Sequence, residues 1–185
     1  MASDILVIDD EADIRMMIAG ILEDEGYSTR EASDSDTALD AIQRRRPSLV
    51  IQDIWMTGSR LDGLGVLEVI KRDHPLVPVL MISGHGNVET AVSAIKKGAY
   101  DFIEKPFKTD RLLLMVERAI EAARLRRENE ELRLRAGSVT ELLGQSPAVV
   151  QLRASIDKVA PTGSRVLITG PAGAGKEIVA RMIHA

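Results

Sequence analysis

The sequence predicts an α/β fold: a doubly wound sheet of five parallel strands covered by helices on both faces. Short runs rich in β-branched residues alternate with helical patterns through the first 108 residues. Five such runs are found, and alternation of this kind favours a parallel sheet with both faces covered. Hydrophobic residues make up 45% of the 185 residues, so the chain is globular.

The strands are expected in order at residues 5–8, 27–32, 49–51, 79–82 and 101–104. The helix after the first strand has apolar residues at helical spacing from Ile14 to Leu22 and stops at Gly26. Asp34 is expected to cap the second helix. The third and fourth helices are expected at 64–72 and 87–97. The apolar face of the fourth consists of Val88, Ala91, Val92 and Ile95.

A long helix is predicted from Thr109 to about Ala136, because this stretch contains neither glycine nor proline. One side of it has spacings of three and four residues, as in a coiled coil, with Asn129 at a position where a buried polar residue would fix register. Two interpretations remain open, a paired helix and a solvated linker that pairs with nothing. The residues of this seam are Ala122, Leu125, Asn129, Leu132 and Ala136.

Carboxylates follow two of the predicted strands. Asp9 and Asp10 follow the first strand, and Asp53 follows the third. In a parallel sheet the active crevice lies beyond the carboxyl ends of the strands, so the three should meet there. Like charges at close range repel unless a cation neutralises them, and oxygen ligands of this kind favour Mg²⁺.

Two further groups should face the same crevice, the hydroxyl of Ser83 and the ammonium of Lys105. Together they suit phosphoryl transfer to a carboxylate, with Asp53 as nucleophile and Mg²⁺ and Lys105 neutralising the transferred oxygens. Ser83 would donate a hydrogen bond to the product. Each of these residues alone could be an ordinary helix cap, turn residue or surface group. Their occurrence together at the ends of the strands argues against these ordinary explanations.

Four stretches resemble the signature sequences of two-component response-regulator receivers: Leu6-Val-Ile-Asp-Asp-Glu11, Val50-Ile-Gln-Asp-Ile54, Met81-Ile-Ser-Gly84 and Phe102-Ile-Glu-Lys-Pro-Phe107. The resemblance covers about residues 4–120. It implies a flavodoxin-like (CheY-like) receiver domain over residues 1–120.

The resemblance also implies roles for individual residues. A sensor histidine kinase would phosphorylate Asp53, and the residue pair Lys105–Pro106 would have a cis peptide bond. The implied Mg²⁺ ligands are Asp10, Asp53 and the backbone carbonyl of Trp55, with Asp9 acting indirectly. The implied phosphoryl contact is Lys105, and the implied switch residues are Ser83, Phe102 and Pro106.

Two features depart from the common receiver pattern. Family members usually have Asp-x-x-Met-Pro after the phosphorylation site, whereas this chain has Asp53-Ile-Trp-Met-Thr57. The following loop, residues 58–63, is longer by about two residues than the loop that the resemblance implies. The longer loop is similar to that of the NtrX branch of the NtrC-like regulators, which implies nitrogen or redox signalling and an NtrY-like kinase.

A second unit is expected over residues 140–185. A strand at 166–169 would feed a glycine-rich loop that matches the GxxxxGK part of a P-loop, and Lys176 would reach the β and γ phosphates. With Leu143-Gly-Gln-Ser-Pro147, this stretch resembles the opening of the σ54-activator AAA+ domain, in which Glu after the lysine is normal. ATP is the implied ligand of the longer protein, and the implied nucleotide-binding residues are Gly170, Gly173, Gly175, Lys176 and Glu177.

The chain is therefore expected to be a signalling switch and not a turnover enzyme. Contacts with σ54 RNA polymerase and DNA would belong to regions absent from this chain. One rival is a P-loop ATPase whose front domain only regulates it, and another is a flavodoxin-like FMN carrier. Three clustered carboxylates argue against the FMN carrier, because a phosphate needs N–H donors.

No cysteine is present, no run of about 18 apolar residues exists, and the expected location is the cytoplasm without a membrane partner. A homodimer is expected through the fourth helix, the fifth strand and the start of the long helix. The charged residues on this face are Lys96, Lys97, Asp101 and Arg118.

Overall fold

The computed structural model describes residues 3–84, 88–137 and 142–184, and these divide into two compact units, 1–127 and 128–185. The first unit is a five-stranded parallel sheet in the order β2-β1-β3-β4-β5. This confirms the predicted fold class. Its strands are β1 (Asp4–Ile8), β2 (Ser28–Ala32), β3 (Leu49–Asp53), β4 (Val79–Ser83) and β5 (Asp101–Glu104).

Five helices accompany the sheet and confirm the alternation. Asp34 caps α2 as predicted, since its side chain accepts hydrogen bonds from the N–H groups of Asp36 and Thr37. Asn87, the predicted start of the fourth helix, lies outside the described residues. The bounds are α1 (Ala12–Asp24), α2 (Ser35–Arg44), α3 (Gly63–Asp73), α4 (Val88–Lys96) and α5 (Thr109–Gly137).

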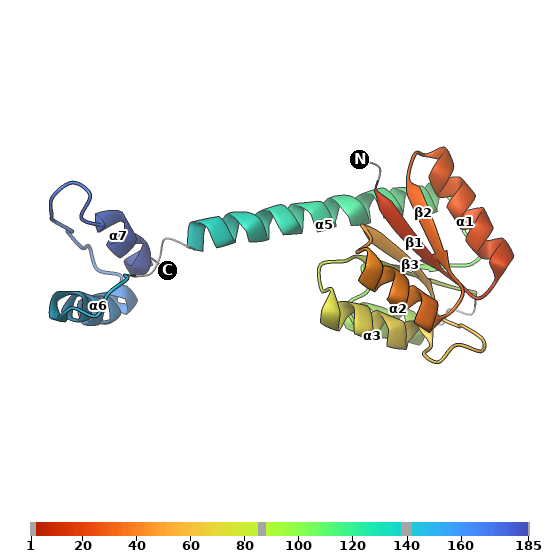
Figure 1. The fold of residues 1–185 in the computed structure, drawn as a ribbon, viewed down its shortest axis with the longest axis horizontal. Coiled ribbons are helices and arrows are strands. Elements are labelled where there is room, and N and C mark those ends of the chain that lie inside the picture. The colour runs from red at the N-terminus through yellow and green to blue at the C-terminus, as the bar shows by residue number, and fades with distance from the viewer. Residues whose placement is uncertain (1–2, 85–87, 138–141, 185) are drawn as a thin grey trace. The chain divides into compact units, whose positions relative to one another are not determined.

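The core has two halves, one on each face of the sheet. Alternate residues of a strand point to opposite faces, so Leu6 and Ile8 pack with α2, α3 and α4, while Ile5 and Val7 pack with α1 and α5. Figure 1 shows α2 and α3 side by side on their face. The inner strands β1, β3 and β4 are buried on both faces and are therefore almost continuously apolar, whereas the edge strands β2 and β5 are more polar and more exposed.

The apolar face of α4 does not pack on the sheet. Val88 is 79% exposed, and Val92 and Ile95 are also exposed, whereas Ala94 is fully buried against the core. Periodicity correctly placed the apolar residues on one face of the helix, but that face is turned to solvent.

The second half of α5 extends past the core of the first unit. Leu125 and Leu132 of the predicted seam are exposed, and Asn129 is exposed with them. Contacts within this chain therefore leave both interpretations of the seam open. The helix was predicted to break at residues 136–138, but α5 includes Ala136 and Gly137, and Ser138 lies outside the described residues.

The second unit contains α6 (Pro147–Val159), the short 3-10 helix η1 (Ala160–Thr162) and α7 (Lys176–His184). Ser146 caps α6, where it accepts a hydrogen bond from the N–H of Val149. The strand predicted at 166–169 was wrong: these residues form no strand. A strand exists only when it pairs with another, and no described segment pairs with this one.

Candidate functional site

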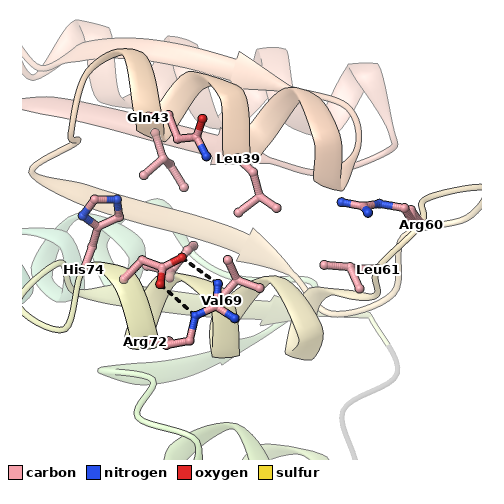
Figure 2. A pocket seen from close by; sticks show the side chains of 10 residues that line it. Leu39, Gln43, Arg60, Leu61, Val69, Arg72 and His74 are labelled. Atoms are coloured by element: carbon pink, nitrogen blue, oxygen red, sulfur yellow. Dashed lines mark hydrogen bonds and ion pairs between the residues drawn. The ribbon is translucent and has the colours of Figure 1, made fainter.

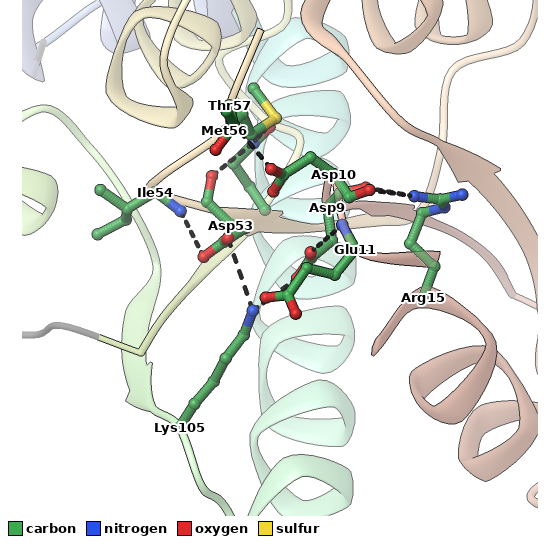
Figure 3. A network of polar contacts seen from close by, with 10 residues as sticks. Asp9, Asp10, Glu11, Arg15, Asp53, Ile54, Met56, Thr57 and Lys105 are labelled. Atoms are coloured by element: carbon green, nitrogen blue, oxygen red, sulfur yellow. Dashed lines mark hydrogen bonds and ion pairs between the residues drawn. The ribbon is translucent and has the colours of Figure 1, made fainter. Parts of the chain in front are cut away.

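Three carboxylates meet at the carboxyl end of the sheet, as the strand pattern predicts. Asp9 and Asp10 follow β1, Asp53 ends the neighbouring β3, and one oxygen of each lies within 4.8 Å of the others. Asp9 and Asp53 are only 2% and 5% exposed. Figure 3 shows the three converging.

Lys105, which directly follows β5, reaches across to this cluster. Its Nζ lies 2.7 Å from Oδ2 of Asp9 and 3.5 Å from Oδ2 of Asp53. Burial alone would lower the pKa of Lys105, but the hydrogen bond with Asp9 and the charge of Asp53 raise it above its usual value. The lysine is therefore a fixed cation.

Burial raises the pKa of Asp53 to about 6, and the charge of Asp9 pushes it in the same direction. Lys105 and the hydrogen bond that Asp53 Oδ1 accepts from the N–H of Ile54 oppose this rise. The net rise shows that Lys105 does not offset the combined effect of burial and the charge of Asp9 on Asp53. A divalent cation would balance the remaining charge, and a set of carboxylate oxygens suits Mg²⁺.

The remaining predicted residues of the receiver site belong to β4, to β5 and the residues that follow it, and to the loop after β3. Ser83 ends β4 and is fully buried, and its carbonyl accepts a hydrogen bond from the N–H of Lys105 at 2.8 Å. The Lys105–Pro106 peptide bond is cis. Phe102 on β5 is half-buried against the core, and Trp55 is 54% exposed in the loop after β3.

Arg15 was missed by the sequence reasoning. From α1, it donates hydrogen bonds to the backbone carbonyls of Asp9 at 2.7 Å and Asp10 at 3.2 Å, and its Nε pairs with Glu31 of β2. Figure 3 shows the guanidinium beside the backbone of this acidic pair. Arg15 thus fixes the turn after β1. A charged residue within an apolar helical pattern was the available signal.

Gln52 was missed as well, although a polar residue within a buried strand is a signal. It is fully buried, and its Nε2 donates to the carbonyl of Asp53 at 2.7 Å and to Sδ of Met56 at 3.3 Å. Its Oε1 has no hydrogen-bond partner. A buried unpaired acceptor costs about 1–3 kcal/mol. The amide nevertheless holds the backbone of Asp53.

The backbone around Asp53 also requires a glycine at the start of α3. A Cβ built on Gly63 would lie 1.9 Å from the carbonyl oxygen of Asp53. The N–H of Gly63 donates to the carbonyl of Ile54 at 2.9 Å, and the N–H of Thr57 donates to Oδ2 of Asp10 at 3.0 Å. The loop after β3 is therefore fastened to the site at both ends.

The predicted nucleotide-binding residues come together in the second unit. The cavity there measures about 390 Å³. Lys176 begins α7, and its Nζ donates to the carbonyls of Gly170 at 2.8 Å and Pro171 at 2.6 Å. All three predicted glycines have positive φ, which glycine adopts without strain. The cavity is lined by Gly173, Ala174, Gly175, Lys176, Glu177 and Ile178.

A cavity of about 440 Å³ between α2 and α3 lies away from the acidic cluster (Figure 2). Leu39 and Val69 face it from the two helices. The arginines at its rim are already paired, Arg60 with Asp36 and Arg72 with Asp73. No unpaired charge of these arginines is left to select a ligand.

Comparison with known proteins agrees with this geometry. Residues 5–117 match the response regulator receiver domain, and residues 142–185 match the sigma-54 interaction domain. The chain therefore belongs to the response regulators with a receiver domain. Among the described helices, none is both long enough and apolar enough to cross a membrane.

Its relatives include regulators of the NtrX type. The chain is 62% identical over 185 residues to the nitrogen assimilation regulatory protein NtrX of Azorhizobium caulinodans, covering 100% of this chain and 40% of that protein. The chain thus spans about 40% of the length of this curated relative.

Two solved structures are also similar. NtrX from Brucella abortus in complex with ATP is 63% identical, with a TM-score of 0.73 over 100% of this chain and 40% of that one. The beryllofluoride-activated NtrC4 receiver domain dimer is 41% identical, with a TM-score of 0.61 over 65% of this chain and 98% of that one.

Proposed function

We propose that this chain is the phospho-accepting part of an NtrX-type response regulator and that Asp53 accepts the phosphoryl group from a sensor histidine kinase. The observation that supports this most is the acidic cluster with Lys105 bridging Asp9 and Asp53. The proposed division is a receiver domain at 1–120, a linker helix at 109–136 and the start of an AAA+ domain at 140–185, although residues 140 and 141 lie outside the described residues.

In the proposed reaction, an Oδ atom of Asp53 attacks the phosphorus of a phosphohistidine. The new O–P bond forms as the P–N bond breaks, and the kinase imidazole leaves and takes up a proton. Lys105 lies close enough to neutralise the transferred oxygens, and the hydroxyl of Ser83 would donate to one of them.

Mg²⁺ is the proposed cofactor, and when bound it would neutralise charge on the phosphoryl oxygens. Asp10, Asp53 and the carbonyl of Trp55 are the proposed ligands, and Asp9 would act indirectly. The hydrogen bonds from Arg15 to the backbone of Asp9 and Asp10 support this, because they fix the turn that presents both carboxylates.

The proposed switch couples Asp53 to the surface of α4 and β5. Ser83 would move toward the phosphoryl group, and Phe102, which is half-buried, would turn inward; Pro106, next to Lys105, is the third proposed switch residue. The exposed apolar residues of α4 support a homodimer through this face. Lys97 is already paired with Glu68 of α3, which leaves Asp101, Lys96 and Arg118 as the charges proposed to pair between subunits.

The proposed output is ATP-dependent activation of σ54 RNA polymerase at DNA, through parts of the longer protein. Lys176 and the cavity at the start of α7 support nucleotide binding there, with Gly170, Gly173, Gly175 and Glu177 as the other proposed contacts. The proposed setting is nitrogen or redox regulation in the cytoplasm, with an NtrY-like kinase as donor.

Phosphotransfer from a purified, autophosphorylated kinase of the NtrY type tests this function. Radiolabel should pass from the kinase to the chain within minutes and only with Mg²⁺ present. Asp53→Asn should accept no label, while Asp40→Asn, an exposed carboxylate on α2, should accept as much as the unmodified chain. Label that reaches Asp53→Asn equally would refute the assignment.

A further inference from the structure

Two cations face one small cavity at the end of the sheet opposite the acidic cluster. The cavity measures about 150 Å³ and lies beside the segments that precede β4 and β5, whereas Asp53 lies at the carboxyl end of β3. Lys71 of α3 and Arg126 of α5 both line it. The remainder of its wall is small or apolar: Pro75, Leu76, Pro78, Gly98, Ala99, Tyr100, Ala119, Ala122 and Ala123.

The Lys71 ammonium is held in place. Its Nζ donates a hydrogen bond to the carbonyl of Val77 at 2.5 Å. Its stem lies against Gly98, because a Cβ built on Gly98 would be 3.4 Å from Lys71 Cγ, an ordinary van der Waals distance. One hydrogen bond uses one of three ammonium donors. Two donors are left for the cavity.

Neither cation has an anionic partner in the part of the chain that the structure describes. Among the described residues, no ion pair joins Lys71 or Arg126 to a carboxylate, although Glu130 lies one helical turn beyond Arg126. Other cations of this unit are paired: Arg15 with Glu31, Arg30 with Asp4, Arg60 with Asp36, and Lys97 with Glu68.

The two charges act on each other. Burial and the positive charge of Arg126 lower the pKa of Lys71 to about 8. Keeping both cations beside one cavity therefore costs free energy, and an anion between them would recover it. Two unpaired positive charges match a dianion better than a single carboxylate.

We propose that this cavity binds a small dianionic oxyanion of the phosphate type between the Lys71 ammonium and the Arg126 guanidinium. Such an anion would join the last turn of α3 to α5. Arg126 is the penultimate residue of the first compact unit, so binding would fasten α5 to the receiver where the helix leaves it.

Inorganic phosphate is the probe, and titration calorimetry with thermal unfolding provides the measurements. The experiment uses the full chain with EDTA, and sodium chloride maintains constant ionic strength. Phosphate should bind and raise the melting temperature, because a ligand of the folded state stabilises it by mass action. Lys71→Met and Arg126→Gln should each weaken binding at least tenfold.

Two control variants keep the test decisive. Arg111→Gln removes a charge from the same helix outside the cavity and should bind phosphate normally. Lys176→Gln removes the lysine of the glycine-rich loop. This variant should still bind phosphate in the proposed cavity, whereas Arg126→Gln should not. Arg126 is exposed, so its variant should fold even if Lys71→Met does not.

Binding that is lost in Lys176→Gln but unchanged in Arg126→Gln would overturn the proposal, because the phosphate would then occupy the glycine-rich loop. Heat and stabilisation that chloride reproduces at equal ionic strength would overturn it too, since screening alone would then explain the effect.

Discussion

Asp53 combines burial with two acidic neighbours, so its ionised form is costly when no cation is bound. The sequence predicted this cluster because strand ends meet in a parallel sheet. It did not predict Arg15 or Gln52 as supports. Their contacts are with backbone carbonyls, whose positions depend on the turns after β1 and β3 and not on residue type.

The raised pKa of Asp53 makes stability depend on pH in EDTA. The folded chain holds this proton up to about pH 6, whereas an unfolded aspartate loses it near pH 4. The folded state therefore binds more protons in this window, and its stability falls as pH rises through it. Asp53→Asn cannot ionise and escapes that loss.

We expect urea unfolding of Asp53→Asn and the unmodified chain to give similar stabilities near pH 4. The variant should become more stable by a margin that grows toward pH 7. Other titrating groups are common to both proteins, so the difference isolates Asp53. A difference that does not change between pH 4 and pH 7 would contradict the raised pKa.

Metal binding should offset the free-energy cost of ionising Asp53 in the folded state. Millimolar Mg²⁺ should raise the melting temperature at pH 7, because a cation bound to the folded state relieves the repulsion of the three carboxylates. Asp10→Asn should lose most of that rise, while Asp40→Asn on the exposed side of α2 should retain it. Differential scanning fluorimetry suffices, and an identical response in Asp10→Asn would argue against the site.

At the scale of elements, helical periodicity identified faces but not what covers them. Val88, Val92 and Ile95 form an apolar face of α4, as expected, yet the sheet contacts Ala94 instead. Periodicity describes one element at a time, whereas the packing depends on the length of the α4–β5 connection and the neighbouring helices. The strand expected at 166–169 failed for a related reason, since strands need partners.

At the start of α3, the backbone of Gly63 lies very close to the carbonyl of Asp53, and the residue pattern could not reveal this contact. Gly63→Ala would place a Cβ 1.9 Å from the carbonyl oxygen of Asp53, so the helix or the strand must shift. We expect a loss of about 3 kcal/mol in unfolding free energy, together with weaker Mg²⁺ binding.

Gly20→Ala is the matched control, because a Cβ there meets nothing within 4 Å and the residue lies inside α1. It should stabilise the chain by about 1 kcal/mol. Denaturant unfolding of both variants gives the comparison. Equal stability of Gly63→Ala and the unmodified chain would mean that α3 is not anchored on Asp53.

At the scale of the whole molecule, a single chain leaves apolar residues of α4 and α5 exposed. Leu114, Leu125 and Leu132 of α5 are exposed in addition to the face of α4. An isologous dimer would cover the α4 face. It would also bring Asp101 of one subunit close to a cation of the other subunit, Lys96 or Arg118. The charge of Asp101 should therefore affect self-association.

Analytical ultracentrifugation with and without acetyl phosphate tests this arrangement. Asp101→Lys should weaken self-association about tenfold or more, and phosphorylation should change the affinity of the unmodified chain. Asp40→Lys, on α2 and outside this face, should leave association unchanged. If neither charge reversal at Asp101 nor phosphorylation alters the sedimentation, the long helix acts only as a tether.

The central claim is that Asp53 accepts a phosphoryl group, and mass spectrometry of the intact chain after treatment with acetyl phosphate and Mg²⁺ tests it most directly. The unmodified chain should gain a single phosphoryl group, located at Asp53 by peptide mapping, and EDTA should prevent the addition. Asp53→Asn should remain folded and gain none. A phosphoryl group of equal yield on Asp53→Asn, or one mapped to another residue of the unmodified chain, would contradict the account.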